Sequence, residues 1–245
     1  MISFGILLAS ITLASAQNDT MYVMKNGVVI NKQSVAPADV DSIIFFAPQV
    51  TALTDADGNV YGTVTIGTQV WMSENLKTTK FNDGADIPLV TGNSEWGSLT
   101  TPAYCWYNND EETYKNLYGG YYTWYAVNTG KLCPEGWHVP TKDEWTTLIN
   151  YLGGASVAGG KLKSTGTEYW NSPNTDATNE SGFSGLPGSQ RPNIFSSLGT
   201  NGRWWSSSEY TSISSHAYVL YHDEAVIRRN SSNRRYGLNV RCIKD

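Results

Sequence analysis

The residues best suited to chemistry in this chain are aromatic and polar side chains close together in its last quarter. Trp204 and Trp205 are followed by Glu209 and Tyr210. Aromatic faces stack on apolar surfaces and carboxylates accept hydrogen bonds, and a sugar-binding surface needs both. Adjacent residues of a strand point to opposite faces, so we expect only one of the two tryptophans to line an outer surface. The alternative is that this run is structural.

A second group of the same kind is Asn108, Asn109 and Asp110. Amide and carboxylate side chains offer donors and acceptors to sugar hydroxyls. Both groups are therefore candidate ligand-binding residues, with a polysaccharide or glycan as the expected partner. The second group, too, has a purely structural alternative.

Two arginine pairs form a candidate anion site. Arg228-Arg229 and Arg234-Arg235 flank the segment Asn230-Ser231-Ser232-Asn233, which we interpret as a turn. Four guanidinium groups at one hairpin tip would attract a carboxylate or sulfate. We favour the alternative that they form a solvated edge that discourages strand pairing.

The segment Asp55-Ala56-Asp57-Gly58-Asn59 resembles half of a calcium loop, with Asp55, Asp57 and Asn59 as candidate ligands. A complete EF-hand loop needs a Glu seven residues after Asn59, where this chain has Ile66. Turn chemistry explains the segment without a metal ion. We therefore expect no cofactor and keep calcium as the weaker alternative.

The histidines do not form a catalytic or metal-binding group. His138 precedes a capped helix and is interpreted as structural. His216 and His222 share a face of one predicted strand, but their spacing separates them by roughly 20 Å. No nucleophile motif and no zinc-ligand spacing occurs in the sequence. We expect a protein that is not an enzyme.

Three cysteines leave one thiol over if a disulfide forms. We prefer Cys133 with Cys242, because one starts a helical segment and the other lies on the last strand. The alternative pair is Cys105 with Cys133. In the preferred pairing Cys105 is a buried small apolar residue.

The first sixteen residues predict export. Ile2–Leu13 is an apolar stretch, and Ala14-Ser15-Ala16 is a small-x-small site, so we expect signal-peptide cleavage after Ala16 and a secreted, cell-surface or periplasmic protein. No Lys or Arg precedes the apolar stretch. No segment has the roughly 20 apolar residues of a membrane span. The net charge of -5 argues against nucleic acid as a partner.

A short leader follows at residues 17–49. Asn26-Gly27 between two apolar runs predicts a β-hairpin, and residues 41–46 read as a strand. A lone hairpin is marginal in water, so the leader is expected to dock on the main domain or on another surface protein.

The main domain, residues 50–245, reads as an α+β pattern with two main helices, antiparallel strands and long loops. One helix is predicted at 141–152, where Thr141 and Glu144 form a capping box, and a second at 121–127. Residues 164–197 are rich in Ser, Asn, Gly and Pro and read as loops. Strands are expected at 204–206, 217–222, 225–228 and 238–243.

Several runs, in order, resemble the Fibrobacter succinogenes major paralogous domain, an exported bacterial family, over roughly Thr54 to Asp245. They are Asp57–Tyr61, Ile66–Leu76, Tyr104–Asp110, Trp124–Val127, Cys133–Thr141, Trp204–Glu209 and Val240–Cys242. The resemblance implies a C-type-lectin-like fold, similar to that of formylglycine-generating enzymes, and surface proteins linked to polysaccharide adhesion. The Glu-Pro-Asn and Gln-Pro-Asp triplets of calcium-dependent lectins are missing.

The leading expectation is thus an exported, non-catalytic surface or secreted domain that binds glycan. The first alternative is a structural or protein-interaction subunit of a cell-surface assembly that pairs through its leader. A lesser alternative is an oxidase similar to formylglycine-generating enzymes, which would need two free, metal-binding thiols.

Overall fold

The computed structural model describes residues 20–25, 28–34, 53–195 and 197–245. The chain divides into two compact units, residues 1–50 and residues 51–245. The expected signal peptide, its cleavage site and the strand expected at 41–46 lie outside the described residues.

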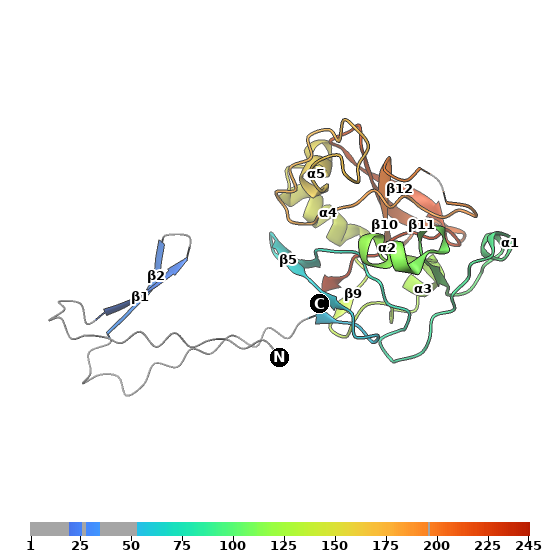
Figure 1. Cartoon of the computed structure of the whole chain (residues 1–245), viewed down its shortest axis with the longest axis horizontal. Coiled ribbons are helices and arrows are strands. Elements are labelled where there is room, and N and C mark those ends of the chain that lie inside the picture. The colour runs from blue at the N-terminus through green and yellow to red at the C-terminus, as the bar shows by residue number, and fades with distance from the viewer. Residues whose placement is uncertain (1–19, 26–27, 35–52, 196) are drawn as a thin grey trace. The chain divides into compact units, whose positions relative to one another are not determined.

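The first unit contains one antiparallel hairpin, formed by β1 (Thr20–Lys25) and β2 (Val28–Ser34) (Figure 1). Lys25 pairs with Val28, so the hairpin predicted from Asn26-Gly27 is confirmed, although those two residues are outside the described part. The pairing shifts register between Val23 and Met24.

The second unit is mixed α/β, with several antiparallel sheets and few helices. The helices are α1 (Asn93–Gly97), the 3₁₀ helix η1 (Tyr107–Asn109), α2 (Glu111–Tyr118), α3 (Trp124–Val127), α4 (Lys142–Tyr151) and α5 (Ala155–Leu162). The short strands are β3 (Leu53–Thr54), β4 (Val60–Tyr61), β5 (Thr63–Ile66), β6 (Gln69–Met72), β7 (Tyr104–Cys105), β8 (Tyr121–Tyr122), β9 (Trp137–His138) and β13 (Ile243–Lys244).

The longest strands form a three-stranded sheet in the order β10 (Asn201–Glu209), β11 (Ser214–Tyr221) and β12 (Ile227–Asn233). Alternation along these strands sends Trp204 and Tyr218 to one face and Trp205 and Ala217 to the other. The first face packs on α4 and α5, and the second on α3 (Figure 1). Both faces of the sheet are therefore covered at β10 and β11, whereas the edge strand β12 is partly exposed.

A second sheet brings distant segments of this unit together, in the order β5-β6-β13-β9. Ile243 of β13 pairs with Trp71 of β6 on one side and with His138 of β9 on the other. Since β13 lies near residue 245 and β6 near residue 70, this sheet ties the two ends of the unit together.

The aromatic residues are mostly core. Eight of the nine tryptophans are buried, and Trp137 is half-buried. Rings contact one another within the core, as where Trp145 of α4 stacks on Tyr218 of β11 with centroids 4.5 Å apart. The aromatic composition is thus largely accounted for by packing, which leaves few rings for contact with a ligand.

The best-predicted element is α4. Thr141 accepts a hydrogen bond from the backbone N–H of Glu144, and the Glu144 carboxylate accepts one from the N–H of Thr141 at 2.7 Å. This capping box confirms the predicted start of the helix. Trp145 and Leu148 form the buried face, as the spacing predicted.

The helix expected at 121–127 is only partly present. Tyr121 and Tyr122 form β8, which pairs with β7, and the helix is the single turn α3. The sequence reading also missed α2, which begins after the N-cap Asp110, and α5. Because α2 is short and mostly polar, it has too few apolar residues for their spacing to predict a helix.

Two glycines explain why α5 was not predicted. Gly159 and Gly160 lie inside this helix, where glycine costs about 1 kcal/mol relative to Ala. A Cβ on Gly159 would lie 2.6 Å from the carbonyl oxygen of Ala225, and one on Gly160 would lie 2.3 Å from that of Asp176. Close packing against two loops therefore fixes a helix that propensity disfavours.

The segment expected as a strand at 238–243 is regular only in β13. Its earlier residues form single bridges to separate partners, Leu238 with Tyr122 and Asn239 with Trp204. Between Leu162 and Asn201 the described residues form no helix or strand, as the loop-rich composition predicted.

Candidate functional site

Trp204 and Trp205 are both fully buried, which corrects the expectation that one of them lines an outer surface. The Trp204 indole donates to the Asn75 side chain at 2.8 Å, and the Trp205 indole donates to the Tyr122 carbonyl at 2.8 Å. The physical reason is that both faces of the sheet are covered, so strand alternation places one ring in each of two cores. Neither ring is available to stack on a ligand.

The exposed part of the same run is the end of the β10–β11 hairpin. Tyr210 is 60% exposed, and its ring contacts the His216 ring edge-on at 5.1 Å between centroids. Beside it, the carboxylate of Glu209 and the guanidinium of Arg234 form an ion pair at 3.1 Å. We call Glu209, Tyr210, His216 and Arg234 the hairpin tip.

The hairpin tip is anchored to the core through Arg234. The Arg234 guanidinium lies 4.3 Å from the ring centroid of buried Trp124 and donates to the Thr211 carbonyl at 2.8 Å. The Tyr210 N–H donates to the Ser214 carbonyl at 3.1 Å, which closes the turn. The tip therefore presents the Tyr210 ring and the Glu209 carboxylate, with half-buried His216 beside them and the largely buried Arg234 side chain beneath.

The two arginine pairs do not flank a turn, so the turn expected at 230–233 is wrong. Asn230 pairs with Ala217 and Asn233 with Ser214, so this segment is the body of β12. The turn between β11 and β12 instead lies at 222–226. At about 3.3 Å per residue, the two arginine pairs are separated by the length of a strand.

Each of the four arginines has a different environment. Arg228 makes a two-pronged ion pair with Glu224, with N···O distances of 2.8 and 2.7 Å. Arg229 is exposed, Arg234 joins the hairpin tip, and Arg235 is half-buried. The exposed arginines lie on the sheet edge, as expected of charges that discourage strand pairing.

In the candidate group Asn108, Asn109 and Asp110, two residues make structural hydrogen bonds. Asn109 donates to the Thr91 carbonyl and accepts from Arg191, while Asp110 accepts from the N–H of Thr113 at 3.0 Å and caps α2. Asn108 is exposed and has a φ of 49°, a left-handed conformation that Asn tolerates better than most residues. This group lacks an exposed aromatic ring of its own.

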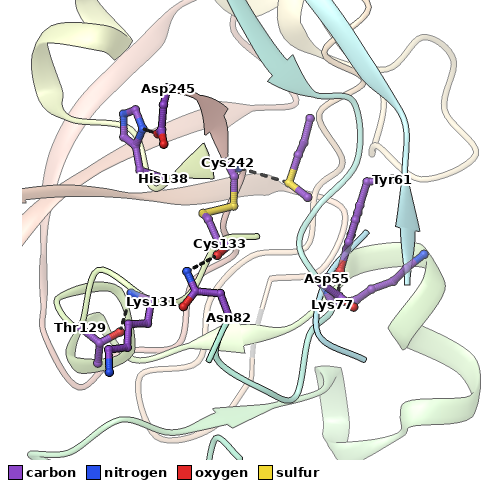
Figure 2. Close-up of a disulfide and its surroundings, with 11 residues drawn as sticks. Asp55, Tyr61, Lys77, Asn82, Thr129, Lys131, Cys133, His138, Cys242 and Asp245 are labelled. Carbon is purple, nitrogen blue, oxygen red and sulfur yellow. Dashed lines mark hydrogen bonds and ion pairs between the residues drawn. A yellow bond between two sulfur atoms is a disulfide. The ribbon is translucent and has the colours of Figure 1, made fainter. Parts of the chain in front are cut away.

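The calcium candidates are occupied by turn hydrogen bonds. Asp55 accepts from the backbone N–H of Asp57 and Asn59 and from the Tyr61 hydroxyl at 2.5 Å (Figure 2). Asp57 accepts from the N–H and hydroxyl of Thr79. The backbone contacts of Asp55 are turn chemistry, whereas Thr79 and Tyr61 lie outside the turn; together they engage the carboxylate oxygens that a cation would need.

Cys133 and Cys242 form a disulfide, so the preferred pairing is confirmed and the Cys105–Cys133 alternative is wrong (Figure 2). The bond joins residues 109 positions apart. Cys105 is the remaining free thiol; it is fully buried, and burial raises its pKa to about 12. A small cavity of about 120 Å³ adjoins Cys133 and His138.

His138 lies near this disulfide, with Asp245 beside its ring (Figure 2) and Glu144 as a second carboxylate partner. Its ring nitrogens lie 2.6 Å from an Asp245 oxygen and 2.8 Å from a Glu144 oxygen. Partial burial lowers the pKa of His138, but the hydrogen bonds to Asp245 and Glu144 outweigh it and the net pKa is raised. The residue links β9, α4 and the segment after β13, as a structural histidine does.

Sequence reasoning missed an open groove of about 320 Å³ between α4, the start of α5 and the edge strand β12. Its lining residues are Thr146, Ile149, Asn150, Ala155, Tyr218, Ile227 and Arg229. The sequence did offer one signal for this shared face, because Ile227 and Arg229 alternate along β12 and His216 and Tyr218 alternate along β11. The helix that forms the other wall is brought there only by the fold.

Three buried cations were also missed. Arg191, Arg241 and Lys163 are each 1% exposed or less. Their side chains donate mainly to backbone carbonyls: Arg191 to Val90 and Thr91, Arg241 to Phe183 and Ser184, and Lys163 to Thr175, Tyr221 and Glu224. Burial lowers the pKa of Lys163 to about 8. Through these bonds the three cations hold the long loops against the rest of the unit.

Comparisons with known proteins agree with the motif reading. The family model described as the Fibrobacter succinogenes major domain matches residues 64–244. Searches of curated proteins and of solved structures gave no match. The matched range takes in β6, the disulfide, α4 and the three-stranded sheet with its hairpin tip. The chain belongs to the Fibrobacter succinogenes major domain family.

Proposed function

We propose that this protein is an exported, non-catalytic surface or secreted domain that binds polysaccharide through its hairpin tip. The observation that carries the proposal is the Tyr210 ring, which is 60% exposed and braced by His216. An exposed, braced ring loses little conformational freedom on binding. The exposed Glu209 carboxylate beside it, held by Arg234, supplies acceptors for hydroxyl groups.

Export is proposed from the signal sequence at residues 1–16. The Cys133–Cys242 disulfide fits an exported protein, because disulfides persist in oxidising compartments. Among the described residues, no helix has the length and apolar character needed to cross a bilayer.

We propose a C-type-lectin-like fold on the strength of the family and the arrangement of small antiparallel sheets, few helices and a long loop region. Within that fold we propose sugar binding without calcium. This proposal is supported by the carboxylate oxygens of Asp55 and Asp57, which accept hydrogen bonds within and next to the 55–59 turn.

The proposal of a non-catalytic role draws on the cysteines. An oxidase of the formylglycine-generating kind would need two reactive thiols. Cys133 and Cys242 are joined, and burial raises the pKa of the Cys105 thiol to about 12. A reactive cysteine needs a lowered pKa and access to solvent, and Cys105 has neither.

The proposal is tested by electrophoresis of the purified protein through native gels that contain dissolved polysaccharides. We expect retardation by at least one polymer, and we expect Tyr210→Ala to weaken it. Loss of one stacking ring costs about 1 kcal/mol, so the dissociation constant should rise about fivefold.

Tyr151→Ala is the matched control, since Tyr151 is also well exposed, at 66%, but lies outside the hairpin tip on α4. The control should migrate like the wild type. If no polymer in a broad panel retards the protein, polysaccharide binding is wrong. If Tyr151→Ala and Tyr210→Ala have equal effects, the tip is not the binding surface.

A further inference from the structure

The groove between α4 and β12 has the walls of a small ligand site. Tyr218 and Ile227 form its floor, and Ile149 adds apolar surface from α4. Thr146 and Asn150 supply a hydroxyl and a carboxamide from the helix. Its volume of about 320 Å³ lies at the lower end of the range for small-ligand pockets, about 300–1,000 Å³.

The groove carries one charge, that of Arg229, and none of the described residues that line it is acidic. Arg229 is exposed and, among the described residues, forms no ion pair with a carboxylate. Its neighbour Arg228 alternates to the other face of β12 and is paired with Glu224. The two adjacent arginines thus differ in two respects: the face of β12 on which they lie and the presence of a carboxylate partner.

The electrostatic effect of Arg229 is felt at the neighbouring His216 side chain. The pKa of His216 is lowered by partial burial and by the positive charges of Arg229 and Lys142. Lys142 is itself paired with Asp143, so Arg229 is the uncompensated charge facing the groove. A positive groove on a chain of net charge -5 is a local arrangement and is not a consequence of overall composition.

The groove and the hairpin tip are linked through β11, which contributes Tyr218 to the groove and His216 to the tip. His216 and Tyr218 are alternate residues of β11 and share a face, and Arg229 is the cross-strand partner of Tyr218. The His216 ring in turn contacts Tyr210. An extended chain stacked on Tyr210 can therefore follow this face into the groove.

We infer that the groove binds the carboxylate of an acidic sugar, such as a uronic acid unit of a polysaccharide, with Arg229 as its guanidinium partner. A planar guanidinium pairs with a carboxylate through two parallel hydrogen bonds. The Asn150 carboxamide would donate to and accept from the sugar hydroxyls, and the Thr146 hydroxyl, which donates to the Lys142 carbonyl at 2.8 Å, would accept from them. This inference rests on the proposed polysaccharide binding and names the class of polymer.

The test compares two polymers with the same backbone, polygalacturonate and its fully methyl-esterified form, in native affinity gels at pH 7 and low salt. We expect the wild type to bind the acidic polymer about tenfold more tightly, as a charged hydrogen bond is worth about 1.5 kcal/mol or more. Arg229→Gln should abolish this preference, and Arg229→Lys should restore part of it.

Arg228→Gln is the matched control, because it removes the same charge one residue away on the opposite face. It should leave the preference unchanged. Asn150→Asp places a carboxylate on the groove wall and should weaken only binding of the acidic polymer. The thermal unfolding of each variant should match that of the wild type, because all three positions are exposed.

Each contrary outcome points to one error. Equal retardation by the two polymers, with Tyr210→Ala still disruptive, overturns the acidic sugar and leaves the proposed function standing. Equal loss in Arg228→Gln and Arg229→Gln means an unspecific charge effect and overturns the groove. Absence of binding to either polymer and to a neutral panel overturns both proposals.

Discussion

His138 joins three separate segments of the second unit through its two ring nitrogens. Asp245 and Glu144 lie on opposite sides of the ring, at 2.6 and 2.8 Å. The protonated ring donates to both carboxylates, whereas the neutral ring has only one N–H. The hydrogen bonds to these two groups raise the pKa of His138 despite the lowering effect of its burial. The contact is therefore a source of pH-dependent stability.

The direction of the pH dependence follows from the raised pKa. The folded pKa exceeds the unfolded value of 6.5, so the stabilisation is fully present below pH 6.5 and is lost as pH rises through the folded pKa. We predict that the difference in unfolding free energy between wild type and His138→Gln shrinks as pH rises above 6.5. Because the ring is partly exposed, the change should be below about 1 kcal/mol. Urea unfolding at several pH values measures it, and a difference that stays constant with pH would contradict the assignment.

Residue-scale predictions succeeded where a motif or the predicted element around a residue carried the signal. The role of His138 followed from the capped helix after it, and the Cys133–Cys242 pair, 109 positions apart, followed from the elements on which the two cysteines were placed. The burial of both Trp204 and Trp205 did not, because it depends on which elements cover each face of the sheet. The buried cations Arg191 and Arg241 were also beyond local reasoning, since their partners are carbonyls more than fifty residues away.

At the scale of elements, α4 is the support of both proposed surfaces. Its N–H at Lys142 donates to Ser208 at the end of β10, and its middle forms one wall of the groove. The capping box at Thr141 fixes where the helix begins. Stability of this helix therefore affects the tip and the groove together.

Thr141→Ala removes the side-chain cap of α4. We predict a loss of about 1 kcal/mol in unfolding free energy, because the Glu144 N–H loses its acceptor. Thr147→Ala is the matched control: this exposed threonine donates its hydroxyl to the Asp143 carbonyl one turn earlier and caps no helix end, so the change should stay within about 0.5 kcal/mol. Denaturant unfolding of both variants decides it, and equal losses would show that the capping box adds nothing.

Elements with a strong local signal were the ones that the sequence predicted. Asn26-Gly27 predicted the β1–β2 hairpin and the Thr141–Glu144 pair predicted α4. The arginine-flanked turn at 230–233 was wrong because Asn and Ser also occur in a paired strand, and the register with β11 overrides their turn preference. The helix α5 required knowledge of the loops that approach Gly159 and Gly160.

At the scale of the whole molecule, the second unit is closed by contacts between its ends. The Cys133–Cys242 disulfide and the pairing of β13 with β6 and β9 hold residues near 70, 135 and 243 together. In the chain-entropy model, closing a loop of this length stabilises by about 4–5 kcal/mol. The hairpin tip and the groove therefore lie on a unit whose distant segments are joined covalently and by strand pairing.

The central claim is calcium-independent polysaccharide binding, and the most direct test is a glycan array probed with residues 17–245, with and without a chelator. We predict binding to at least one polysaccharide class, strongest for acidic polymers. Binding should be unchanged by the chelator, because turn hydrogen bonds engage Asp55 and the Thr79 hydroxyl engages Asp57. Loss of binding in chelator would contradict the calcium-free mechanism, and an array without any bound polysaccharide would contradict the function itself.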